Sequence, residues 1–171
     1  STSSNHIGNL SPLPDTAEEV NEIAAALGAD ASRDVFLGTA ASESNFRKQD
    51  LSNRRVVMFA THGLVAGDLN GLTQPALALS NPAVTGERDV DGLLTMDEVL
   101  GLKLNADWVV LSACNTAAAD GKGGEAVSGL GRAFFFAGAR ALLVSNWPVE
   151  TISARLITTD LFRRQVADAT L

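Results

Sequence analysis

Residues 55–63, RVVMFATHG, decide the fold, because they join an uninterrupted apolar run to a polar turn. A strand that is buried on both faces has such a run, which is typical of the centre of a parallel sheet. Two further runs have the same character, DWVVLSA at residues 107–113 and RALLVS at residues 140–145. We therefore expect three central strands, each with a polar turn after its carboxyl end.

Amphipathic segments between these runs predict helices. Thr16-Ala17-Glu18-Glu19 and Thr95-Met96-Asp97-Glu98 have the Thr-x-x-Glu form of a capping box, which predicts a helix start at each. The predicted helices cover about residues 16–27, 42–51, 95–102, 125–138 and 151–167, with short strands at 34–38 and 76–79 and a polar loop at 81–92. Strands that alternate with helices predict an α/β fold, and ligands of such folds bind beyond the carboxyl ends of the strands.

Length and composition limit the class of protein. The chain has 171 residues, of which 46% are hydrophobic and 19% charged, and this fits one globular domain. Its formal charge of −7 repels phosphate groups, so we expect neither nucleic acid nor a membrane surface as a partner. Residues 1–12 lack the regions of a signal peptide and are expected to form a flexible leader before a domain at residues 13–171.

Cys114 and His62 each follow one of the central runs. A nearby imidazole can hold a cysteine as the thiolate, which is the nucleophilic form. If the two strands are neighbours, both residues lie at one edge of the sheet, and histidine 52 positions before cysteine resembles the caspase order. The N–H groups of Gly63 and Cys114 would then form an oxyanion hole. The alternative is that Cys114 is a small buried apolar side chain, the commonest fate of a lone cysteine.

The remaining candidate sites have weaker patterns. His6 lies in the predicted leader and is expected to be solvated, and two histidines without a second cysteine lack the spacing of a metal site. Residues 121–124, GKGG, lack the frame of a phosphate-binding loop, and Ser112 lacks the G-x-S-x-G frame of a serine nucleophile. We therefore expect no metal and no cofactor. A single cysteine excludes an internal disulfide and favours a cytoplasmic location.

Seven short motifs occur in order along residues 13–167. They are FATHG at 59–63, DGLLT at 91–95, VLSACNT at 110–116, GE at 124–125, GRAF at 131–134, GAR at 138–140 and SNWPV at 145–149. Together they resemble the CHAT domain, a family of the caspase and separase clan of cysteine peptidases. The resemblance implies a caspase-like three-layer α/β/α sandwich with a mostly parallel central sheet.

The resemblance also implies an activity. It makes His62 the base and Cys114 the nucleophile of a cysteine endopeptidase that cleaves a protein partner through a thioester. CHAT domains are usually attached to helical repeats that receive an activating signal, so a helical-repeat regulatory region or partner is expected outside this chain. The competing hypothesis is a catalytically idle domain that serves signalling or assembly. The presence of both His62 and Cys114 favours the peptidase.

Clan relatives such as separase build their specificity pocket after the third central strand. The corresponding candidate substrate-binding residues here are Ser145, Asn146, Trp147 and Glu150. Trp147 would supply an apolar wall, and Glu150 would pair with a basic residue before the scissile bond, unless it only caps the following helix. The sequence departs from the family pattern in two places: Thr151 stands where a second acidic residue is common, and the chain ends at Leu171 where relatives continue through a helix and a closing strand.

Overall fold

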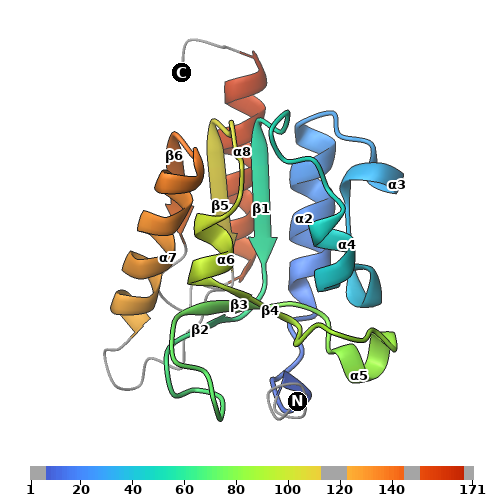
Figure 1. Cartoon of the computed structure of the whole chain (residues 1–171). Coiled ribbons are helices and arrows are strands. Elements are labelled where there is room, and N and C mark those ends of the chain that lie inside the picture. Colours follow the sequence, from blue (N-terminus) through green and yellow to red (C-terminus); the bar gives the residue numbers. More distant parts are fainter. Residues whose placement is uncertain (1–6, 113–122, 145–150, 168–171) are drawn as a thin grey trace.

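The central element is a three-stranded parallel sheet (Figure 1), seen in a computed structural model that describes residues 7–112, 123–144 and 151–167. Its strands are β1 (Val56–Ala60), β5 (Trp108–Ser112) and β6 (Ala141–Val144), in the order β1-β5-β6. The three apolar runs therefore form parallel strands, as predicted. β5 lies in the middle and is the most deeply buried, because it has a strand on each side.

Helices cover both faces of this sheet (Figure 1). On one face Phe59 of β1 packs against Phe134 of α7, with ring centroids 5.6 Å apart. On the other face Trp108 of β5 meets Phe162 of α8 edge to face at 6.3 Å. From residue 15 on, the α-helices of the described residues are α2 (Asp15–Ala26), α3 (Ala31–Asp34), α4 (Glu43–Arg47), α5 (Pro82–Thr85), α6 (Met96–Leu100), α7 (Gly123–Ala137) and α8 (Thr151–Ala167). The described part of the chain is thus an α/β fold, as predicted.

A small antiparallel sheet lies beyond the carboxyl end of β1 (Figure 1). It consists of β2 (Gly63–Leu64), β3 (Ala76–Ala78) and β4 (Leu93–Thr95), in the order β2-β3-β4. Ile7 is only 6% exposed and packs in the core of this sheet, with Leu10 beside it. The described part of the predicted leader, residues 7–12, therefore packs against the domain.

The prediction of a buried strand at residues 34–38 was wrong. This segment follows α3, contains no strand and leads into a 3-10 helix, η1 (Gly38–Ala40). Phe36 and Leu37 are 36% and 37% exposed, so the apolar residues that suggested a strand are not buried in the core. The Asp30 side chain accepts the Ser32 N–H at 2.9 Å and favours a helical turn at this point.

The two predicted capping boxes had different outcomes. At Thr95 the box is formed, because the Thr95 N–H donates to the Glu98 carboxylate at 2.8 Å while the Glu98 N–H donates to Thr95 Oγ1 at 3.4 Å. At Thr16 the prediction was wrong, since α2 begins at Asp15 and the Thr16 hydroxyl donates to the Leu13 carbonyl at 2.7 Å. Thr16 is therefore not the N-cap of α2, and the buried Glu19 accepts the Ser112 hydroxyl.

Two further predicted boundaries were wrong. α4 ends at Arg47, short of the predicted end at residue 51, and α5 lies inside the predicted loop at 81–92. Asn81 caps α5 through its side chain, which accepts the Ala83 N–H at 2.9 Å. Within the described residues, no helix is both long enough and apolar enough to cross a bilayer.

Candidate active site

His62 lies between the two sheets, two positions after the end of β1. The preceding Thr61 N–H donates to the Ser112 carbonyl at 3.2 Å, which ties this point of the chain to β5. The His62 carbonyl accepts the Ala78 N–H at 2.9 Å, which ties it to β3. The backbone on each side of the histidine is therefore fixed, as a catalytic base requires.

The imidazole of His62 has a defined partner. Its Nε2 lies 2.8 Å from the backbone carbonyl of Ser11, in the N-terminal segment. A carbonyl can only accept, so Nε2 must carry the proton and donate it. In the neutral ring the lone pair is then on Nδ1, and that atom is the one able to take a proton from a thiol.

Gly63 directly follows the histidine and begins β2. In an antiparallel pair, hydrogen-bonded and non-hydrogen-bonded residues alternate along the strand. Because His62 accepts the Ala78 N–H, the next pair, Gly63 with Leu77, is of the non-hydrogen-bonded kind. The Gly63 N–H therefore points away from β3, an orientation that suits the predicted role as an oxyanion donor.

Cys114, the predicted nucleophile and second oxyanion donor, lies outside the described residues. The strand that leads to it is described, however, and β5 is the parallel neighbour of β1. The last paired residues are Ala60 and Ser112, so each of the two predicted dyad residues follows its strand end by two positions. The dyad prediction depended on β1 and β5 being neighbouring strands, and this part of it is confirmed.

The predicted specificity residues Ser145, Asn146, Trp147 and Glu150 also lie outside the described residues. The strand before them, β6, is parallel to β5, with Val144 paired to Leu111. β6 therefore ends at the same edge of the sheet as β1 and β5.

Glu19 is a residue of this edge that the sequence did not identify. It lies on α2 and is only 4% exposed, and its two carboxylate oxygens are 2.9 and 2.8 Å from the Ser112 hydroxyl. That hydroxyl donates, since an ionised carboxylate can only accept. Glu19 stands four positions before the buried Ile23, so the two share a helix face, and this spacing was the available signal.

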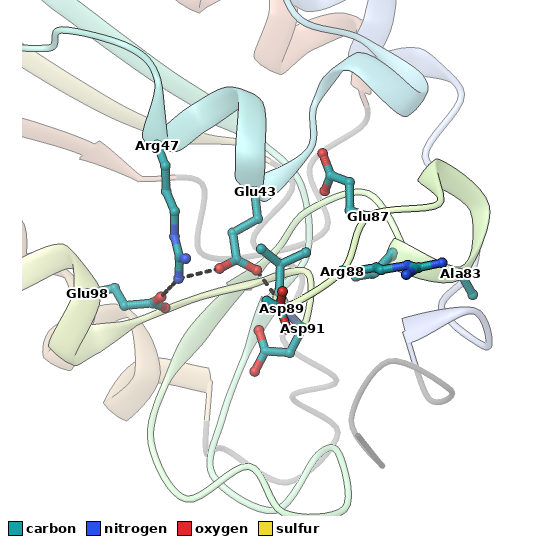
Figure 2. A pocket seen from close by; sticks show the side chains of 10 residues that line it. Glu43, Arg47, Ala83, Glu87, Arg88, Asp89, Asp91 and Glu98 are labelled. Carbon is teal, nitrogen blue, oxygen red and sulfur yellow. Dashed lines mark hydrogen bonds and ion pairs between the residues drawn. The ribbon is translucent and has the colours of Figure 1, made fainter.

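A second group of charged residues lines a cavity of about 690 Å³ (Figure 2), and neither His62 nor Gly63 is among its described lining residues. Arg47 bridges Glu43 at 2.6 Å and Glu98 at 2.8 Å. Glu43 is 2% exposed, and burial raises the pKa of its carboxyl group, although the Gly92 N–H and Arg47 act in the opposite direction. Because these groups bind one another, the geometry describes a structural network.

Other chemistry is not supported by the described residues. Within residues 7–112, 123–144 and 151–167, no three His, Cys, Asp or Glu side chains are grouped so that they could hold a metal ion. Ser112, which was considered as a nucleophile, uses its hydroxyl to bind Glu19. Among the described side chains at this edge, His62 and Glu19 can exchange protons, and Glu19 binds the Ser112 hydroxyl.

The fold and this edge define a class: an α/β protein with a histidine beyond the carboxyl end of a strand of its parallel sheet, where such folds bind ligands. The sequence profile of the CHAT domain matches residues 2–170. The chain therefore belongs to the CHAT family, which is a family of caspase-like cysteine peptidases, and the resemblance seen in its motifs is confirmed. Searches of curated proteins and of solved structures found no significant match.

Proposed function

We propose that this chain is a cysteine endopeptidase in which His62 is the base and Cys114 the nucleophile. Its domain would have the caspase-like three-layer α/β/α sandwich. It would act on a protein substrate as the effector part of a larger signal-activated protein, with helical repeats as the regulatory region. Membership of the CHAT family supports the class of reaction.

One observation carries the proposal: the parallel pairing of Ala60 with Ser112 at the ends of β1 and β5. Two residues of extended chain span at most ~7 Å, and neighbouring strands lie ~4.8 Å apart. His62 and Cys114 each follow their strand end by two positions. The pairing supports the proposed dyad, because the two residues start from neighbouring strand ends.

The reaction would proceed by acyl transfer. Nδ1 of His62 takes the thiol proton, and the sulfur of Cys114 attacks the scissile carbonyl. The N–H groups of Gly63 and Cys114 stabilise the oxyanion, and the leaving amine receives its proton from His62. Water, deprotonated by His62, then hydrolyses the thioester and releases the second product. The Ser11 carbonyl keeps the proton on Nε2 and so leaves Nδ1 free for each transfer.

We further propose that Ser145, Asn146, Trp147 and Glu150 bind the substrate residue before the scissile bond, and that this residue is basic. A carboxylate at Glu150 would form a charge-assisted hydrogen bond with lysine or arginine. A peptide panel that varies this one position tests the preference. A preference for aspartate, or a basic preference that survives Glu150→Gln unchanged, would exclude the role of Glu150.

The test of the activity is a fluorogenic peptide panel with four proteins: wild type, Cys114→Ala, His62→Ala and the control His6→Ala. Cleavage by wild type and by His6→Ala, with none by Cys114→Ala, is the expected result. Equal cleavage by wild type and Cys114→Ala would contradict the proposal. Failure of wild type to cleave any peptide would also contradict it and would favour the idle signalling or assembly domain.

A further inference from the structure

The contact between Glu19 and Ser112 joins the helix α2 to the end of the central strand β5 across 93 residues of sequence. Both side chains are buried, at 4% and 6% exposure. Burial of a carboxylate is unfavourable unless hydrogen bonds compensate for the lost water, and an apolar side chain would fill this position without that cost. Packing alone therefore does not explain why a charged residue, Glu19, is buried at this position.

Ser112 is held from two directions. Its hydroxyl binds Glu19, while its carbonyl accepts the Thr61 N–H at 3.2 Å and its Cα pairs with Ala60. Within the described residues, it is the last at which β5 is bound to β1, before the chain continues to Cys114. A displacement of Ser112 would therefore also displace the chain that leads to His62 and to Cys114.

The N-terminal part of the chain contacts both His62 and Ser112. The Ser11 carbonyl binds Nε2 of His62 at 2.8 Å, and α2, which begins at Asp15, carries Glu19 to Ser112. The packing of Ile23 and Phe162 with Val110 of β5 fixes α2 against the sheet. Glu19 therefore acts from a rigid element and not from a loop.

We infer that Glu19 is a positioning residue, which acts through Ser112 to hold the strand end that leads to Cys114. This inference rests on the proposed function, because the residue that it positions is the proposed nucleophile. A displacement of ~1 Å in a reacting group can lower a rate by ~10²-fold. The expected result of losing the contact is thus a lower kcat with little change in KM.

The experiment compares Ser112→Ala, Ser112→Thr and Glu19→Gln in the full chain, with Glu18→Gln as the matched control on the exposed side of α2. Thermal unfolding curves first identify one temperature at which all of these proteins are folded. The kcat and KM for peptide cleavage, and the rate at which iodoacetamide alkylates Cys114, are then measured at that temperature. Alkylation needs no substrate and reports on the thiol itself.

We expect Ser112→Ala to lower kcat by about tenfold or more, with KM within about twofold of wild type. Ser112→Thr keeps a hydroxyl and should restore the rate. Glu19→Gln should lower kcat as well, because it alters the same contact. Glu18→Gln should change kcat much less than Glu19→Gln does, because Glu18 lies on the exposed side of α2.

Wild-type kcat and alkylation rates in folded Ser112→Ala would overturn the inference. If Glu19→Gln does not fold, the pair Ser112→Ala and Ser112→Thr still decides the question. A failure of the proposed function has a different signature. In that case no variant cleaves peptide, and His62→Ala leaves the alkylation of Cys114 unchanged.

Discussion

Two buried glutamates hold two different regions of this protein. Glu43, on α4, accepts the N–H groups of Asp91 and Gly92 at 3.1 and 2.9 Å and pairs with Arg47, so it fixes the loop before β4. Glu19, on α2, accepts the Ser112 hydroxyl and fixes the end of β5. Both use a buried carboxylate to hold a backbone segment, but only Glu19 does so beside the candidate active site.

The comparison separates two kinds of family motif. The DGLLT motif at residues 91–95 is architectural, because Glu43 binds its first two N–H groups and Thr95 caps α6. The FATHG motif at residues 59–63 carries His62 to the edge of the sheet. The two regions should therefore respond differently to substitution: the first in stability and the second in activity.

The largest expected effect is that of His62→Ala on catalysis. Loss of the proposed general base should lower kcat/KM by about 10²–10⁴-fold. The free energy of unfolding should fall by about 1 kcal/mol, because one hydrogen bond to the Ser11 carbonyl is lost. Peptide cleavage and urea unfolding of the same sample give both quantities. A large fall in the free energy of unfolding with an unchanged kcat/KM would contradict this expectation, because the FATHG motif would then serve stability and not activity.

The next largest effect is that of Gly92→Ala on stability. Gly92 has a φ of +78°, and a Cβ there would lie 2.7 Å from Pro82 Cδ and 3.0 Å from the Ser80 carbonyl oxygen. We expect a loss of about 2–4 kcal/mol in the free energy of unfolding, from strain and steric overlap together. The kcat of the folded fraction should be unchanged.

Gly86→Ala is the matched control for that loss. Gly86 has a similar φ of +72° but no atom within 4 Å of an added Cβ. Its substitution should cost only the backbone strain, about 1 kcal/mol. Urea unfolding of the two variants compares them directly, and equal losses would show that packing around Gly92 is not the cause.

A smaller effect is the opposite pH dependence of Glu43 and Glu98, the two carboxylates bound to Arg47. Burial is the largest single influence on Glu98 and raises its pKa, but hydrogen bonds from Thr95 and Arg47 together lower it below the ordinary value of 4.5. The stabilisation from Glu98 is therefore present above pH 4.5 and is lost as the pH falls through the folded pKa. For Glu43 burial raises the pKa, so its contribution is present below pH 4.5 and is lost as the pH rises.

Urea unfolding of wild type, Glu98→Gln and Glu43→Gln between pH 7 and pH 3.5 tests these signs. The stability advantage of wild type over Glu98→Gln should shrink as the pH falls. Its advantage over Glu43→Gln should grow over the same range. If both stability differences grow, or both shrink, as the pH falls, the two carboxylates do not have distinct environments.

The central strands could be predicted from sequence because their burial depends on continuous apolar runs, as in Trp108–Ser112. The capping box at Thr95 could be predicted for a similar reason, since its two partners are three positions apart. The box at Thr16 could not, because Glu19 has a partner 93 positions away that no local pattern contains. The segment at residues 34–38 has the composition of a strand, but none of the described strands pairs with it.

The candidate site also has residues that a local sequence pattern can predict and contacts that it cannot. His62 could be identified because a polar turn after a central strand is visible in the sequence. Its partner Ser11 could not be, since the contact is made by a backbone carbonyl, which every residue has. Ser112 was considered only as a nucleophile, because its role as a donor to Glu19 depends on how α2 packs against the sheet.

The most direct test of the His62–Cys114 dyad is covalent labelling by an electrophilic peptide probe, such as a peptidyl acyloxymethyl ketone, followed by mass spectrometry. Wild type and the control His6→Ala should be labelled at Cys114, because a neighbouring imidazole holds the thiol in its reactive form. His62→Ala should be labelled at least about 10²-fold more slowly. Labelling of Cys114 at the same rate in wild type and in His62→Ala would show that the two residues do not form a dyad.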